Sequence, residues 1–205
     1  TRKQKFEIDV ESAMCGMGIN QIQTFSFISP KFYDKIRLPA DSALRNSVVI
    51  SNPLGEDTSV MRTTALPSAL EVIARNCNFN NDNVKIFEIA TVYIPTGADT
   101  LPEEKKVICA AMYGNCDFYD LKGIVESLIN ALGIKNVAYT AEKADPTFHP
   151  GRCARLTING KDAGVLGEIH PLVANNYSIG ARVYAAELDF NTFFENADNS
   201  KTYKA

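Results

Sequence analysis

The sequence predicts a mixed α/β fold of the α+β type, in which an antiparallel sheet is flanked by helices. Several short apolar runs have the alternation or the continuous apolar character of strands. Two of these runs are joined by Asn159-Gly160, a pair typical of a tight hairpin turn. Because the strands come in hairpins, with separate helices instead of a strict strand-helix alternation, antiparallel pairing is favoured over a parallel sheet.

A helix and a strand are the first elements predicted along the chain. Residues 6–18 have apolar side chains at helical spacing, and two glycines weaken the end of this helix. In residues 23–29, Phe25 and Phe27 alternate with polar residues on one face of a strand, and Pro30 ends its pairing. The apolar side of the helix consists of Phe6, Val10, Met14 and Met17.

A short strand at residues 48–51 and a helix at about 64–78 follow, with Pro67 in the first turn of the helix. Residues 84–94 are apolar on both faces, as in a central strand covered by helices on both sides. Glu88 interrupts one of these faces. We expect Glu88 at a strand edge near solvent, with a buried and hydrogen-bonded carboxylate as the alternative.

A second apolar run at 107–113 predicts a hairpin with the preceding strand. Residues 117–132 have the most regular helical pattern, with Asp117 as N-cap and Gly133 as C-cap. Gly123 inside this helix indicates a close approach by another backbone, since glycine destabilises a helix interior by about 1 kcal/mol.

The last third of the chain predicts three more strands and a short helix. Strands at 153–158 and 163–169 form the Asn159-Gly160 hairpin, and a helix at 171–177 begins with proline. The final strand covers 183–190. One face of this strand consists of Tyr184, Ala186, Leu188 and Phe190.

Length and composition limit the function classes. The chain has 205 residues, is 45% hydrophobic and contains no apolar run of the roughly 18 residues that a membrane span needs, so we expect no membrane association. The formal charge of −3 argues against an independent nucleic-acid binder, which needs a basic face. Five cysteines without a C-x-x-C pair favour a reducing, cytoplasmic location.

The domain organisation is predicted to be simple. We expect one domain over residues 1–195, followed by a polar linker at 196–205 that leads toward a further C-terminal domain. The chain begins at Thr1 without an apolar signal segment, and we interpret it as a piece of a longer protein.

The two histidines are the obvious candidates for chemistry, but each directly precedes a proline. His149 is expected in a turn before a strand and His170 at a corner between a strand and a helix, in preference to a ligand role. A catalytic or metal role would need a third ligand or a positioned nucleophile beside them. Since the sequence also has no glycine-rich phosphate loop, it predicts no catalytic, cofactor-binding or metal-binding residue.

Three segments resemble the beta-subunit family of bacterial phenylalanyl-tRNA synthetases. They are NPLGEDTSVMRTTALPSALEVIARN at 52–76, FHPGR at 148–152 and GVLGEIHP at 164–171. The helix pattern DFYDLKGIVESL at 117–128 is also similar to this family. The motif residues are Asn52, Pro53, Glu56, Asp57, Met61, Arg62, Thr63, His149, Pro150, Gly151, Arg152, Gly167, Glu168, His170 and Pro171.

The resemblance implies a class II aminoacyl-tRNA synthetase-like fold. In this family the beta subunit contains a degenerate copy of the catalytic fold, and the alpha subunit carries catalysis. The whole enzyme is a heterotetrameric ligase that attaches phenylalanine to tRNA(Phe) with ATP and Mg²⁺. The resemblance further implies that tRNA is bound mainly by other domains and that this chain itself holds no cofactor.

Departures from the catalytic pattern favour an inactive module. The second class II motif has an ATP-binding arginine after its tyrosine, whereas here Tyr93 is followed by Ile94-Pro95. In the third motif Glu187 and Asp189 stand where glycines would admit a nucleotide, and carboxylates repel a triphosphate. The sequence therefore predicts a scaffold for the alpha subunit and for tetramer assembly. An active nucleotide-dependent ligase and an independent tRNA-binding module are the alternatives.

Class II dimers associate through their first motif, so the resemblance implies that the first helix and strand face the partner subunit. The alternative is that their apolar side chains only fill the core. The predicted interface residues are Phe6, Met14, Met17, Phe25 and Phe27.

Overall fold

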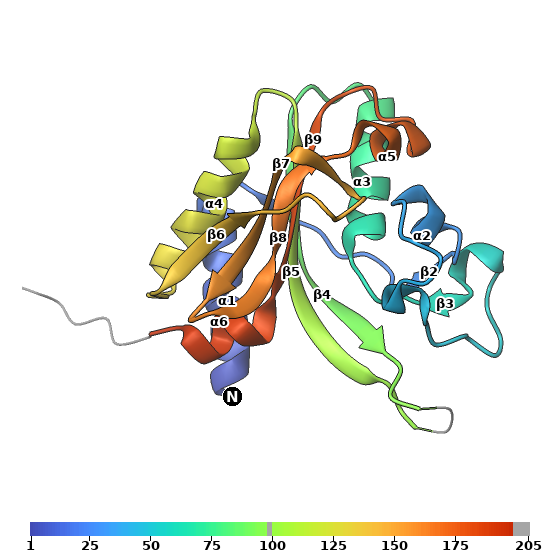
Figure 1. Cartoon of the computed structure of the whole chain (residues 1–205), viewed down its shortest axis with the longest axis horizontal. Helices are drawn as coiled ribbons and strands as arrows, with labels where there is room; N and C mark the ends of the chain where they lie inside the picture. The colour runs from blue at the N-terminus through green and yellow to red at the C-terminus, as the bar shows by residue number, and fades with distance from the viewer. Residues whose placement is uncertain (98–99, 199–205) are drawn as a thin grey trace, which may run out of the picture.

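A seven-stranded sheet forms the centre of the molecule in the computed structural model, which describes residues 1–97 and 100–198 (Figure 1). Neighbouring strands are antiparallel except for the short parallel pair of β1 and β4. The predicted fold class is confirmed. In spatial order the strands are β1 (Asn20–Gln21), β4 (Val84–Ile94), β5 (Glu103–Tyr113), β9 (Val183–Asp189), β8 (Lys161–Ile169), β7 (Phe148–Ile158) and β6 (Val137–Ala141).

Helices cover both faces of this sheet, and each face has its own apolar core. Figure 1 shows α1, α4 and α6 on one side and α2, α3 and α5 on the other. The first side is α1 (Arg2–Gly16), α4 (Phe118–Ala131) and α6 (Phe190–Asn196), and the second is α2 (Phe32–Lys35), α3 (Leu66–Asn78) and α5 (Pro171–Asn176). This arrangement explains why β4 is apolar on both faces.

A small lobe lies beside the second side. It contains a two-stranded antiparallel sheet of β2 (Phe27–Ile28) and β3 (Val60–Met61), with short 3₁₀ turns at Ala43–Arg45 and Glu56–Thr58. The lobe has its own cluster of buried residues, including Ile28, Tyr33 and Val60.

Elements that depend on local signals form where they are expected. Strand β4 has the predicted bounds, and Asp117 caps α4 by accepting hydrogen bonds from Tyr119 and Asp120. Asn159 and Gly160 have φ values of 51° and 77°, as the tight turn between β7 and β8 requires.

The structure corrects several predicted elements. The strand expected at 23–29 is reduced to β2, so Phe25 lies outside any strand, and residues 48–51 form only an isolated bridge between Val49 and Val60. Strands β5 and β7 begin earlier than predicted, while β6 and α6 were not predicted. A Cβ on Gly123 would meet nothing within 4 Å, so the expected close approach is wrong.

The N-terminal helix also begins earlier than predicted. Thr1 and Gln4 form a capping box that starts α1 at Arg2, because the threonine hydroxyl satisfies a free backbone N–H of the first turn. At the other end, residues 199–205 of the predicted linker lie outside the described residues, while Asn196 ends α6 and the Asp198 N–H donates to the Leu132 carbonyl.

Phe6 and Ile8 on α1 provide a matched test of this core. Phe6 is fully buried against Phe190 and Phe194, whereas Ile8 is 59% exposed. Phe6→Ala should lower the free energy of unfolding by about 3–5 kcal/mol because it leaves a cavity. Ile8→Ala should change it by less than about 0.5 kcal/mol. Urea denaturation of both variants checks this, and equal losses would contradict the described packing.

Candidate functional site

Arg62, which follows β3, is the most buried charged side chain of the small lobe, with 1% of its surface exposed. Its Nε donates to the Thr91 carbonyl at 2.9 Å, its Nη1 to Thr24 Oγ1 at 2.7 Å and its Nη2 to Glu88 Oε1 at 3.0 Å. Each nitrogen of the guanidinium therefore has a partner within the chain, as a buried charge requires.

Glu88 is buried as well, with 5% exposure, and it also accepts hydrogen bonds from the backbone N–H and hydroxyl of Thr24. The expectation that Glu88 lies near solvent is therefore wrong. The physical reason is its pairing with Arg62, which lies 26 residues away in the sequence and supplies the opposite charge.

Backbone hydrogen bonds connect the same three segments. The Arg62 N–H donates to the Ser26 carbonyl, and the Tyr93 N–H donates to the Arg62 carbonyl, both at 2.9 Å. Arg62 thus links the segment before β2 to strand β4 through its backbone and its side chain together.

A second carboxylate lies on the same face of the sheet. Glu88 of β4 is paired with Cys109 of β5, and Cys109 is paired with Glu187 of β9, so the three side chains form one row across the sheet. Burial, and then the charges of Glu187 and Glu88, raise the pKa of the Cys109 thiol well above its usual value. Cys109 is therefore a neutral, inert thiol in this row.

Glu187 occupies the N-terminal end of helix α3. Its Oε2 accepts hydrogen bonds from the Ala65 N–H at 2.7 Å and from Thr64 Oγ1 at 2.9 Å. Burial raises the pKa of the Glu187 carboxyl above its usual value, and the hydrogen bonds from Ala65 and Thr64 oppose this rise only in part. The backbone donors at a helix N-terminus are a ready site for a bound anion, and here the chain's own carboxylate fills it.

Glu187 and Asp189 line a cavity of about 380 Å³ on this face of the sheet. Among the described residues that line it, Arg155 is the only cation, and its guanidinium is paired with Glu142 at 3.2 Å and with Asp162 at 3.3 Å. The cavity therefore offers carboxylates and an already neutralised arginine, which is the wrong electrostatic environment for a triphosphate.

The FHPGR and GEIHP motifs meet at one end of the sheet, where β7 and β8 pair. The register of β7 is irregular between Phe148 and Cys153, and a Cβ on Gly167 would lie 2.8 Å from the Arg152 carbonyl oxygen. Glycine is thus required for the two strands to approach here. Arg152 forms an ion pair with Glu168, which is 3% exposed.

Each histidine ring accepts a hydrogen bond from a backbone N–H two residues further along the chain. His149 Nδ1 accepts from the Gly151 N–H at 3.0 Å, and His170 Nδ1 accepts from the Leu172 N–H at 3.1 Å, which caps α5. His149 and Pro150 lie within β7, where the register is irregular, so the turn expected before the strand at His149 is wrong. Pro171 is the first residue of α5, as expected for the corner at His170.

The remaining motif residues belong to the small lobe. Asn52 and Pro53 are exposed, Glu56 forms an exposed ion pair with Lys31 at 2.8 Å, and Met61 ends β3. Thr63 is buried, where its hydroxyl lies 3.0 Å from the Tyr33 hydroxyl and donates to the Leu44 carbonyl. These residues shape the lobe and its attachment to α3.

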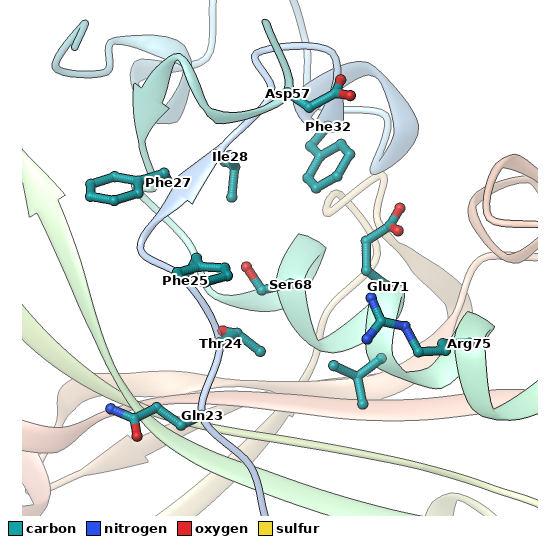
Figure 2. Close-up of a pocket in the computed structure, with 11 residues that line it drawn as sticks. Gln23, Thr24, Phe25, Phe27, Ile28, Phe32, Asp57, Ser68, Glu71 and Arg75 are labelled. Atoms are coloured by element: carbon teal, nitrogen blue, oxygen red, sulfur yellow. The ribbon is translucent and has the colours of Figure 1, made fainter. Parts of the chain in front are cut away.

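A larger groove of about 650 Å³ lies between this lobe and helix α3, and we call it the aromatic groove. Figure 2 shows the segment that carries Phe25 and Phe27 facing α3, which carries Ser68, Glu71 and Arg75. Phe25 is 79% exposed and Phe27 is 41% exposed. The groove is lined by Gln23, Thr24, Phe25, Phe27, Ile28, Phe32, Asp57, Ser68, Glu71, Val72 and Arg75.

The five predicted interface residues therefore separate into two groups. Phe6 and Met14 are buried in the core, and Met17 is partly buried against it, so the core-filling alternative describes these three. Phe25 and Phe27 are exposed side by side in the aromatic groove, where the interface assignment stays a prediction.

Two further kinds of feature are absent from the residues that the structure describes. Within residues 1–97 and 100–198, no group of three or more His, Cys, Asp or Glu side chains is placed to hold a metal ion. Over the same residues, no helix has the length and apolar character needed to cross a membrane.

Comparison with known proteins gives one consistent family. Residues 1–190 match the family described as the phenylalanyl tRNA synthetase beta chain CLM domain. The chain is 48% identical over 206 residues to the phenylalanine–tRNA ligase beta subunit of Clostridium tetani, covering 100% of this chain and 26% of that protein. It is 47% identical over 203 residues to the same subunit of Clostridium acetobutylicum, covering 98% of this chain and 26% of that protein.

Solved structures agree on the fold. The pyrrolysyl-tRNA synthetase of Desulfitobacterium hafniense superposes with a TM-score of 0.75 at 14% identity, covering 98% of this chain and 74% of that one. At this identity the likeness shows the class II synthetase fold alone. The chain spans about a quarter of the length of the ligase subunits that it matches.

The buried pair of Arg62 and Glu88 should carry a large share of the stability of the small lobe. Glu88→Gln leaves the guanidinium without its counter-charge and should lower the free energy of unfolding by about 3–5 kcal/mol. As a control, Glu103→Gln breaks the half-exposed pair with Lys105, which lies two residues further along the same strand β5, and should cost less than about 1 kcal/mol. Chemical denaturation measures both, and equal effects would mean that the buried pair is not a principal contact.

Proposed function

The chain belongs to the phenylalanyl-tRNA synthetase beta-chain family, and on this premise we propose that it is a non-catalytic, class II-like scaffold that supports a catalytic alpha subunit. The whole enzyme then attaches phenylalanine to tRNA(Phe) with ATP and Mg²⁺, in the cytoplasm and as a heterotetramer. In this proposal residues 1–195 form one domain, a linker leads to further domains of the subunit, and those domains make most of the tRNA contacts.

The observation that carries this proposal is the row of carboxylates on the sheet. Arg62 and the N-terminus of α3 are the groups on this face that could neutralise an anionic substrate. Glu88 already pairs with Arg62, and Glu187 already accepts the hydrogen bond of the Ala65 N–H at the N-terminus of α3. A nucleotide would have to displace two buried carboxylates, and each would then be left charged without its partner.

The second class II motif agrees with this conclusion. The hairpin of β4 and β5 places Ile94 opposite Glu103, at the position where the catalytic pattern has an arginine. An aliphatic side chain offers neither charge nor hydrogen-bond donors to a phosphate. The two strands are paired continuously from Val84–Tyr113 to Ile94–Glu103, so the hairpin is a regular structural element that has no arginine at this position.

The aromatic groove is the surface that we propose for contact with the alpha subunit. Phe25 is exposed in a groove that is lined by apolar and polar residues, and such exposed aromatic side chains are typical of binding hot spots. Glu71 and Arg75 at its edge add charges that can fix the orientation of a partner.

The absence of catalysis has a direct test. The isolated chain should give no phenylalanine-dependent exchange of labelled pyrophosphate into ATP, because the groups that would hold the nucleotide are occupied. The complete enzyme of the same organism serves as the positive control. Exchange that follows the purified chain at a constant specific activity would contradict the scaffold proposal.

The subunit contact is tested with two aromatic substitutions. Mixed with the alpha subunit of the same organism, the chain should elute as a complex in light scattering on a sizing column. Phe25→Asp should weaken this complex by about tenfold or more, as loss of an interface hot spot does. Phe79→Asp changes a similarly exposed phenylalanine outside the groove and should leave the complex intact. Equal elution of the two variants would rule out the groove as the contact surface.

A further inference from the structure

A separate cavity of about 350 Å³ lies where the FHPGR and GEIHP motifs meet, and we call it the motif pocket. It shares no lining residue with the aromatic groove or with the cavity beside Glu187. The scaffold role makes no use of it. The residues that give it chemical character are His149, Arg152, Glu168, Ile169, Pro171 and Arg182.

The pocket is built around a fixed guanidinium. Arg152 is held by the Glu168 carboxylate, whose side chain is only 4% exposed, while the Arg152 side chain is 42% exposed. Gly167 allows the backbone at Arg152 to come close, because a Cβ at this position would collide with it. A charged donor that is oriented in advance loses little conformational entropy when it binds a ligand.

Further donors surround this guanidinium. His149 Nδ1 accepts a backbone hydrogen bond, so the proton of the neutral ring is on Nε2, which is left as a donor. Arg182 is exposed and forms no ion pair with any residue that the structure describes. Burial and the charge of Glu168 raise the pKa of the Tyr184 hydroxyl, whereas Arg182 lowers it.

The charge of the pocket favours an anion. Glu168 is the only carboxylate among the described lining residues, and it is already paired, which leaves Arg182 uncompensated. Arg37 adds a further positive charge nearby, since burial and then the charge of Arg37 lower the pKa of His170. This local excess of positive charge occurs on a chain whose formal net charge is −3.

The shape of the pocket narrows the class of anion. One wall is apolar and is formed by Ile169, Pro171, Ala174 and Ile179, beside the guanidinium groups. Arginine donates two parallel hydrogen bonds to phosphate, and an apolar wall suits the face of a base attached to it through the sugar. The volume falls within the range of small-molecule sites. We propose that the motif pocket binds the phosphate group of a nucleotide, either free or as one unit of an RNA strand.

Titration of the ¹⁵N-labelled chain with AMP, followed by NMR, tests this proposal. AMP should shift the amide signals of Gly151, Gly180 and Ala181 in a saturable manner, while adenosine, which has no phosphate, should bind at least about tenfold more weakly. Inorganic phosphate should shift the same signals. Absence of saturable shifts at these residues would overturn the proposal.

Two matched variants show whether the guanidinium of Arg182 contributes to the binding of AMP. Arg182→Gln removes an arginine that has no ion-pair partner among the described residues, so the fold should be preserved, and AMP affinity should fall by about tenfold. Arg75→Gln removes an exposed arginine of the aromatic groove and should leave AMP affinity unchanged. Equal affinity in the two variants would contradict the assignment of this pocket.

A short single-stranded RNA and an acidic peptide of equal charge distinguish the sources of the ligand. Binding of the RNA that is weakened by Arg182→Gln identifies an RNA phosphate, and binding of AMP alone identifies a free nucleotide. Both outcomes support the phosphate site. Preference for the acidic peptide over AMP and RNA would overturn it. Failure here leaves the scaffold proposal untouched, because its test uses the aromatic groove and the alpha subunit.

Discussion

The buried ion pair of Arg62 and Glu88 is the contact on which the arrangement of the second side of the molecule depends. It joins three segments that are distant in sequence: the chain before β2, the residue after β3 and the middle of β4. A buried pair adds little net stability over an apolar pair, but it accepts only one geometry. It therefore fixes the small lobe against the sheet, and with it both walls of the aromatic groove.

How far the sequence predicts the fold depends on how local the signals are. Strand β4, the capped helix α4 and the hairpin at Asn159-Gly160 are specified by neighbouring residues, and they form as predicted. Glu88 was placed wrongly because its counter-charge comes from a distant segment. Strand β6 was missed since it has only five residues, and its alternation rests on Val137 and Tyr139 alone.

In the candidate sites, too, local motifs were predicted from the sequence whereas contacts between distant segments were not. The sequence motifs singled out Arg62 and the FHPGR and GEIHP segments. They did not predict which residues form hydrogen bonds or ion pairs with them. Glu187 lies 123 residues from Thr64, and no pattern in the sequence connects them. Of the five interface residues, Phe6 and Met14 have the same apolar character as Phe25, and only the packing of α1 against the sheet separates core from surface.

The self-filled anion site at the start of α3 has a consequence for the history of the chain. Replacing Glu187 by glycine would free the helix N-terminus, but Thr64 and the Ala65 N–H would lose their acceptor. Freeing Arg62 would leave Glu88 charged and unpaired in the core. Each substitution that opens this face to an anion therefore lowers stability before any binding can compensate for it. Single point mutations meet a barrier in this direction, and the self-filled site behaves as an evolutionary ratchet.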